Sequence, residues 1–284
     1  MILVIGATGS IGTELVQLLS TRGHRLRALV RNPARGETLR PGMEVVQGDL
    51  SRPETLPGAL VGVEKLFAMF HAHDVPALAP SLFEAARHAG VRHVVFLSSG
   101  TILMQPPTKI GNWHLAGEEA LKATGLTFTM LRPGNFNTNT FGWAGSIRAQ
   151  GKVFSPHPES RSAPVDQRDI AAAAAAALTG PGHEGKTYVL TGPEALTARR
   201  QVEIISAAIS RPIELVEVPE AGARAGMLKA GMTEEMANAV LELTRAGASG
   251  SGGDARVTNT IRDLTGTPAR TFETWARDHA SAFA

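Results

Sequence analysis

Residues 2–12 read ILVIGATGSIG, and this stretch predicts how the chain begins to fold. Residues 2–5 are apolar strand formers, glycines follow at positions 6, 9 and 12, and residues 10–22 have the apolar spacing of an amphipathic helix. A strand, a glycine turn and a helix in this order are typical of a loop that binds a pyrophosphate on the free N–H groups of the helix N-terminus. The residues predicted to bind there are Gly6, Thr8, Gly9, Ser10, Ile11 and Gly12.

Outward from this loop, the same alternation of a short apolar run and a longer amphipathic stretch repeats to about residue 132. This pattern predicts βαβ units and a parallel sheet. The expected strands are 2–5, 25–30, 44–47, 65–69, 93–97 and 127–131, and the expected helices are 10–22, 54–61, 76–89 and 110–124. Six strands with intervening helices predict an α/β fold with a doubly wound parallel sheet of the Rossmann type. Its ligand crevice lies outside the carboxyl ends of the strands.

The alternation weakens after Gly134. We expect helices near 136–150, 168–178, 198–209, 233–245 and 272–280, a proline-rich loop at 155–164, and strands at 187–190 and 214–218. The glycine- and serine-rich segment 246–254 is expected to be a loop or lid. The chain is therefore divided into a nucleotide-binding core, residues 1–134, and a smaller substrate-binding cap, residues 135–284, which is interleaved with the core.

Composition argues against several classes of function. The 284 residues include 28 Lys plus Arg and 26 Asp plus Glu, a net charge of +2 that is spread along the chain, so neither a nucleic-acid partner nor a membrane surface is expected. The chain has no cysteine, which excludes disulfides, thiolate metal sites and cysteine nucleophiles. With no basic leader before the first strand and no long apolar run, a soluble cytoplasmic protein is expected; a homo-oligomer stays possible.

The end of the second predicted strand selects the nucleotide. An acidic residue there would bind the ribose 2′-hydroxyl of NAD, but this chain has Arg31, whose guanidinium can hold a 2′-phosphate, with Arg35 near enough to add charge. The prediction is NADP(H), although a solvated surface arginine would look the same. After the third strand, Asp49 could accept a hydrogen bond from adenine or could cap a turn, and Leu50 follows it at the site.

Five short motifs together resemble a known family. They are GATGSIG at 6–12, VRNP at 30–33, GDL at 48–50, FLSS at 96–99 and LRPGNF at 131–136. The chain resembles the atypical short-chain dehydrogenase/reductase superfamily, and in particular its NmrA-like branch, over residues 1 to about 180. The resemblance implies NADPH lying across the strand ends and a substrate domain from the C-terminal half. It also implies that Phe67, Ser98, Pro133 and Gly134 lie beside the cofactor.

The chain departs from the tyrosine-dependent members of that superfamily. Their YxxxK motif would place Tyr at Ile110 and Lys at His114, and the only tyrosine here is Tyr188, in a predicted late strand. Without the phenol acid, we expect an acceptor that needs little help from an acid, such as a quinone-like, azo or other small aromatic compound. NmrA-like relatives include such reductases. The alternative is a sensor that binds NADP(H) without turnover and acts on a protein partner.

His114 and Ser99 are the predicted catalytic residues. The ordinary pKa of histidine suits proton donation near neutral pH, and Glu118, one helical turn further on, could pair with His114. A surface His–Glu pair is the alternative. Ser98 and Ser99 end the fifth strand, where a hydroxyl could bind the carboxamide or the acceptor, or could simply cap the next helix.

The few aromatic residues concentrate after the fifth and sixth strands, where they could form a flat apolar pocket for the acceptor. The residues predicted to bind substrate are Met104, Trp113, Phe136, Phe141 and Trp143. Packing in the core would explain the same concentration. His71 and His73 are spaced as metal ligands could be, but with no third ligand in view no metal is expected.

Overall fold

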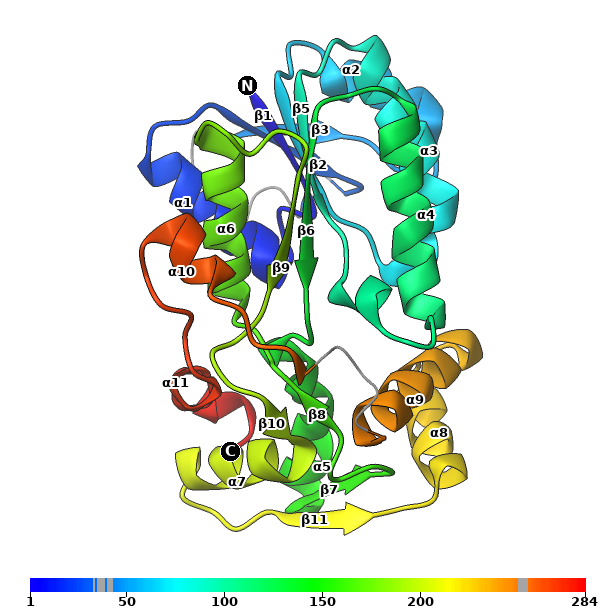
Figure 1. Ribbon diagram of the computed structural model, residues 1–284, viewed down its shortest axis with the longest axis vertical. Coiled ribbons are helices and arrows are strands. Elements are labelled where there is room, and N and C mark those ends of the chain that lie inside the picture. The colour runs from blue at the N-terminus through cyan, green and yellow to red at the C-terminus, as the bar shows by residue number, and fades with distance from the viewer. Residues whose placement is uncertain (33, 35–38, 40–42, 250–254) are drawn as a thin grey trace.

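The computed structural model describes residues 1–32, 34, 39, 43–249 and 255–284. Within these residues one parallel sheet has the strand order β3-β2-β1-β4-β5-β6-β9 (Figure 1). Its strands are β1 (Ile2–Ile5), β2 (Leu26–Val30), β3 (Glu44–Gln47), β4 (Lys65–Ala68), β5 (His93–Leu97), β6 (Phe128–Pro133) and β9 (Lys186–Leu190). This is the predicted doubly wound α/β fold, and all six predicted strands are confirmed to within two residues.

Helices cover both faces of this sheet (Figure 1). One face carries α1 (Ser10–Thr21), α6 (Gln167–Thr179) and α10 (Thr260–Thr265), and the other carries α2 (Leu56–Leu60), α3 (Val75–His88) and α4 (Lys109–Ala123). Alternate strand residues enter the two cores: Ile2 and Val4 pack toward α1, whereas Leu3 packs toward α3. Because both faces of the central strands β1, β2, β4 and β5 are buried, these strands read as nearly continuous apolar runs, which made them recognisable in the sequence.

Residues from the second half of the chain complete the parallel sheet and the helical layer that contains α1. Strand β9 pairs with β6, and α6 packs along α1. Deletion of this half would therefore remove an edge strand and part of one helical layer.

The remaining elements form a smaller lower region (Figure 1). Strand β7 (Lys152–Ser155) pairs with β11 (Glu214–Glu217), and β8 (Arg161–Ser162) pairs with β10 (Leu196–Thr197). The helices of this region are α5 (Ala144–Gln150), α7 (Ala198–Ala208), α8 (Glu220–Lys229), α9 (Glu234–Ala248) and α11 (Phe272–Asp278). Short 3₁₀ helices occur at Pro53–Thr55, Ala72–Asp74, Gly100–Leu103, Asn137–Trp143 and Ala280–Ala282. Helices α8 and α9 pack together as a hairpin, and α9 contacts α4.

Three expectations for the second half need correction. The helix expected at 136–150 is a 3₁₀ helix followed by α5, and the expected loop at 155–164 contains the two residues of β8. The segment 246–254 is not all loop: residues 246–248 continue α9, whereas 250–254 lie outside the described residues. Across the described part of the chain, none of the helices combines the length and the apolar character needed to cross a bilayer.

Candidate active site

The glycine loop lies between β1 and α1 and has the geometry of a phosphate cradle. Gly6 has φ +76°, a left-handed conformation that glycine adopts without strain, and its carbonyl accepts a hydrogen bond of 2.9 Å from the Gly9 N–H. A Cβ added at Gly12 would overlap the Gly6 carbonyl oxygen, so only glycine lets α1 approach the strand so closely. Gly9 is the N-cap and offers no side chain, so the N-terminus of α1 is left open to an anion.

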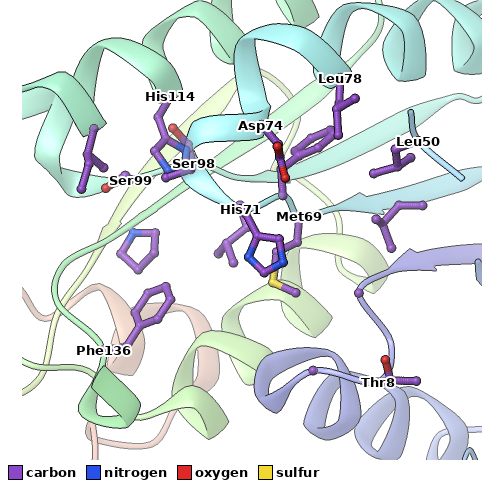
Figure 2. A pocket seen from close by; sticks show the side chains of 18 of the residues that line it. Thr8, Leu50, Met69, His71, Asp74, Leu78, Ser98, Ser99, His114 and Phe136 are labelled. Carbon is purple, nitrogen blue, oxygen red and sulfur yellow. The ribbon is translucent and has the colours of Figure 1, made fainter. Parts of the chain in front are cut away.

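A single elongated cavity of about 1020 Å³ runs across the carboxyl ends of the strands. It extends from Arg31 after β2, past the glycine loop, to Phe136 after β6. Figure 2 shows Thr8 on one side of it and His114 on another wall, with Phe136 at the far end. The volume is at the upper limit for small-molecule sites, and the position is the switch point at which such sheets bind ligands.

At the end near β2, Arg31 and Asp49 both line the cavity. Asp49 Oδ1 accepts hydrogen bonds from the Ser51 backbone N–H (2.9 Å) and from the Ser51 hydroxyl (2.8 Å). These bonds, with a smaller contribution from the charge of Arg31, lower the pKa of Asp49. Of the two roles expected for Asp49, adenine acceptor or turn cap, the turn cap is observed, and Asp49 also lines the cavity. Arg35 lies outside the described residues.

The wall after β4 differs from the expectation. Phe67 is fully buried inside β4 and packs in the core beneath α1, so it does not line the cavity. Met69 does, and its methyl group lies so close to Gly6 that a Cβ there would overlap it. Met69 is two residues beyond Phe67 and lies just after β4, which ends at Ala68. The residue just past the end of the strand therefore lines the cavity, whereas the residue within the strand does not.

A buried ionic network supports the opposite wall. The Glu118 side chain, on α4, is fully buried and accepts hydrogen bonds from Ser98 Oγ (2.7 Å), Arg132 Nε (2.8 Å) and Arg132 Nη2 (2.7 Å). Burial alone would raise the pKa of Glu118, but the bonds from Arg132 and Ser98 lower it overall, so the carboxylate is ionised. Because Ser98 donates its hydroxyl proton to Glu118, it faces the cavity only as an acceptor. Glu118 ties the ends of β5 and β6 to α4.

Ser99 also lines the cavity, and its hydroxyl is engaged locally. Its Oγ accepts a hydrogen bond from the Thr101 backbone N–H (3.2 Å) and lies 2.8 Å from Thr101 Oγ1. It is the N-cap of the 3₁₀ helix Gly100–Leu103, which is the alternative expected for a serine at a strand end.

His114 lines the cavity with a side chain that is only 7% exposed. Burial lowers its pKa to about 4, partly opposed by the charge of Glu118, so the imidazole is neutral at pH 7. Two expectations are therefore wrong: the pKa is not the ordinary one, and Glu118 bonds to Ser98 and Arg132 rather than to His114. The ring lies 6.4 Å from that of Phe96, and Nδ1 is buried without a hydrogen-bond partner.

Comparison with known proteins places this geometry in a family. Residues 6–181 match the sequence model of the NAD(P)H-binding family. The chain belongs to this NAD(P)H-binding family. It is 38% identical to an NAD(P)H azoreductase of Xenophilus azovorans, with 100% of this chain and 99% of that protein covered. It is 39% identical to a (4-alkanoyl-5-oxo-2,5-dihydrofuran-3-yl)methyl phosphate reductase of Streptomyces griseus, with the same coverage.

A solved structure extends the likeness. The crystal structure of an NADPH-dependent quinone oxidoreductase from Escherichia coli, in complex with NADPH, matches with a TM-score of 0.86 and 27% identity, over 98% of this chain and 99% of that one. These matches confirm the NAD(P)H-binding fold that the motifs predicted.

In this NAD(P)H-binding protein most of the expected cofactor residues meet at the cavity, but four of the described ones do not line it: Phe67, which is buried in β4, and three residues of the glycine loop. Ile11 and Gly12 are buried beneath the glycine loop, and Ser10 is exposed at the start of α1. The predicted residues that line the cavity are Gly6, Thr8, Gly9, Arg31, Asp49, Leu50, Ser98, Pro133 and Gly134. The spacing of the glycines identified the loop, but it does not reveal that the helix side of the loop is buried.

The expected aromatic pocket does not form as predicted. Only Phe136 lines the cavity; Met104 is buried, and Trp113 lies beneath the ammonium group of Lys109, 5.5 Å from the ring centre. Phe141 packs on Trp275 near the C-terminus, and Trp143 packs on the lower core. The expectation failed for Phe141 and Trp143 because the 3₁₀ helix Asn137–Trp143 packs both on the core that contains Trp275, which spacing alone does not reveal.

Other residues take their place around Phe136. They are Thr101, Ile110, Asn135, Asn139 and Leu243. Asn139 Nδ2 donates a hydrogen bond of 2.6 Å to Asn135 Oδ1, and Leu243 comes from α9 of the lower region. Ile110 is the position at which the superfamily carries its tyrosine, so that signal was visible in the sequence. For Leu243 there was no such signal.

The two closely spaced histidines do not form a metal site with their neighbours. The rings of His71 and His73 stack with centres 6.2 Å apart, and His71 lines the cavity. Within the described ranges, no cluster of three or more His, Cys, Asp or Glu side chains is arranged to hold a metal ion.

Proposed function

We propose that this protein is an NADPH-dependent reductase that passes hydride to a small aromatic, quinone-like or azo acceptor. One observation carries the proposal: a single cavity joins the phosphate cradle and Arg31 at one end to His114 and Phe136 at the other. Such a cavity brings a dinucleotide and a second molecule into contact above the switch point of the sheet. An azoreductase and a quinone oxidoreductase among the similar proteins support the same chemistry.

The residues at the β2 end of the cavity fit NADP(H). The open N-terminus of α1 and the glycine loop would hold the pyrophosphate, and Arg31 would hold the 2′-phosphate. The backbone of Pro133 and Gly134 would lie beside the nicotinamide. When bound, the reduced nicotinamide supplies the hydride, and the protein supplies orientation and a pocket that excludes water.

The far end of the cavity suits a flat acceptor. Phe136 offers an aromatic face, and Ile110 and Leu243 add apolar contact, while the amides of Asn135 and Asn139 can orient a polar atom of the acceptor. Ile110 stands where a tyrosine would donate a proton, so the acceptor must stabilise the added electron pair largely by itself. A quinone does so, since it gains two electrons from hydride and becomes a hydroquinone after taking one proton from water.

Turnover of purified protein tests the proposal. The protein is incubated with NADPH and a panel of quinones, azo dyes, imines and aldehydes, and the loss of absorbance of the reduced nicotinamide is followed. We expect oxidation of NADPH with quinones or azo dyes. Binding of NADPH with no turnover on the whole panel would instead favour a sensor with a protein partner.

We further propose a cytoplasmic setting with neither a nucleic-acid nor a membrane partner, supported by the evenly spread charges and the cysteine-free sequence.

A further inference from the structure

The two ring nitrogens of His114 have different surroundings. Nδ1 is fully enclosed by protein and has no hydrogen-bond partner. Nε2 is not enclosed in this way, and His114 is one of the residues that line the cavity. Figure 2 places the His114 side chain beside Ser98 and Ser99, at the ends of the strands where the acceptor would lie. One nitrogen is therefore enclosed in the protein interior, and the other is left open on a side chain that lines the cavity.

Among the described residues, most charged groups on α4 and on the elements packed against it already have other partners. Glu118, on the same helix, is held by Ser98 and Arg132, and its Oε2 is 3.8 Å from Lys122 Nζ. From α9, Glu242 accepts the Lys109 backbone N–H, and Glu235 pairs with the Lys109 ammonium group. From the 3₁₀ helix before α3, Asp74 lies 3.4 Å from His73. Glu119, also on α4, is exposed rather than buried with His114, and His71, which precedes that 3₁₀ helix, lines the same cavity.

The enclosed nitrogen decides the position of the imidazole proton. A neutral imidazole carries one N–H and one bare nitrogen. A buried N–H without an acceptor is rarer in proteins than a buried acceptor without a donor, and it loses its hydrogen bond to water outright. The bare nitrogen is therefore Nδ1, and the proton is on Nε2, which opens to the cavity.

We propose that His114 is a neutral hydrogen-bond donor, which directs its Nε2–H at the acceptor atom that gains negative charge and keeps that proton throughout. This inference rests on the proposed function, because that function supplies the acceptor. When hydride reaches a quinone, an electron pair moves onto the oxygen, and the Nε2–H hydrogen bond stabilises the resulting anion. Water supplies the proton that completes the hydroquinone. Burial, which lowers the pKa of His114 to about 4, keeps the ring neutral throughout the working range.

Nitrogen-15 NMR of the ligand-free protein tests the proton position directly. With ¹⁵N-labelled histidine, His114 is assigned by loss of its signals in the His114→Gln variant. We expect Nδ1 to show the shift of a bare nitrogen and Nε2 that of a protonated one, with no change between pH 8 and pH 5.5. A proton on Nδ1, or a titration near pH 6.5, would overturn the proposal.

Three substitutions test the donor in turnover with a quinone. His114→Gln places an amide N–H near the position of Nε2, His114→Asn places one near Nδ1, and His114→Leu has none. We expect kcat of the Gln variant to stay within about tenfold of wild type and that of the Asn and Leu variants to fall about 100-fold. The wild-type kcat should be flat from pH 5.5 to 8, and the KM for NADPH should change little in all three.

Several outcomes would contradict this role. Equal rates for the Gln and Leu variants would remove the donor, and a wild-type kcat that falls tenfold per pH unit above 6.5 would indicate a general acid instead. Where a variant does not fold, as judged by its melting temperature, the NMR result on wild type still decides the tautomer. A wild-type protein that binds NADPH and reduces nothing would overturn the proposed function, and with it the target of the donor, separately from the NMR result.

Discussion

Glu118 and His114 lie one turn apart on α4, but their surroundings leave Glu118 ionised and His114 neutral. Both side chains are buried, and burial disfavours the charged form of each. Glu118 recovers its charge because Arg132 and Ser98 donate hydrogen bonds to it, whereas the enclosed nitrogen of His114 has no partner. The same helix thus presents a fixed anion that anchors structure and a neutral ring that faces the ligand.

The neutral state of His114 predicts a loss of stability in mild acid. The native pKa of about 4 is below the ordinary 6.5, so the unfolded chain binds a proton that the native imidazole does not. The free energy of unfolding should therefore fall as pH drops from 6.5 to 4, by up to about 3 kcal/mol. Urea unfolding at several pH values measures this fall.

The matched variants for that measurement are His114→Gln and His24→Gln. The first should flatten the decline between pH 6.5 and 4. The second, at an exposed histidine after α1, should leave the decline as in wild type. If the wild-type and His114→Gln curves run parallel, the lowered pKa is not the cause.

Arg31 predicts a preference for NADPH over NADH. A charge-assisted bond from its exposed guanidinium to the 2′-phosphate is worth about 1.4 kcal/mol, or tenfold in affinity. Arg31→Ala should lower kcat/KM for NADPH about tenfold and leave the value for NADH unchanged. Arg200→Ala, on α7 away from the cavity and paired with Glu203, is the control. An unchanged NADPH to NADH ratio in Arg31→Ala would mean that another residue selects the cofactor.

At the scale of elements, Glu118 joins three of them: α4, β5 and β6. Glu118→Gln would leave Arg132 as a nearly buried cation without its partner, and breaking a buried pair in this way costs about 3–5 kcal/mol. We expect the melting temperature to fall by roughly 6–15 °C. Glu84→Gln breaks an exposed pair with Arg87 on α3 and should leave the melting temperature close to that of wild type, because solvent screens this pair. Equal melting temperatures for the two variants would show that the network does not hold the layer together.

The carboxylate of Glu220, at the start of α8, joins the α8–α9 hairpin to the rest of the lower region. Glu220 Oε1 accepts a hydrogen bond from Arg245 Nε (2.9 Å) and lies 2.8 Å from His157 Nε2, and the two partners lower the pKa of Glu220 to about 2. Glu220→Gln should speed amide hydrogen exchange in α8 and α9 and leave the parallel sheet unchanged. It should also raise the KM for the acceptor, because Leu243 of α9 lines the cavity.

The control for the hairpin is Glu203→Gln, which breaks an exposed pair with Arg200 on α7. Exchange in α8 and α9 should be the same in this variant as in wild type. Equal exchange in the Glu220 variant would show that packing between the two helices, rather than the carboxylate, holds the hairpin.

Helices and strands could be predicted where their burial produces a regular pattern of apolar residues in the sequence. The central strands β1, β2, β4 and β5 are largely buried and read as apolar runs, whereas the outer strands β3 and β9 are exposed over much of their length. Helix α8 has no buried residue, and β8 and β10 are two residues long, so none of them carries a pattern.

At the site, glycine spacing revealed the phosphate loop. Contacts made by Leu243 depend on how α9 packs against α4, which no local pattern encodes.

At the scale of the whole molecule, the cavity belongs to both halves of the chain. Thr8 and Arg31 come from the first half, whereas Phe136, Asn139 and Leu243 come from the second. A ligand that fills the cavity binds only when both halves are in place, so binding should stabilise the molecule as one unit. We expect NADPH at 100 times its Kd to add about 2.7 kcal/mol and to raise the melting temperature by roughly 5–10 °C.

The size of this shift also separates the two nicotinamide cofactors. At equal concentration NADH should give a smaller shift than NADPH, because it lacks the 2′-phosphate that Arg31 would hold. In Arg31→Ala the two shifts should become equal, which links the charge at one residue to the stability of the whole chain. A thermal shift series with both cofactors measures this. If neither raises the melting temperature of wild type, the cavity does not bind a nicotinamide dinucleotide, and the proposed reductase activity is excluded.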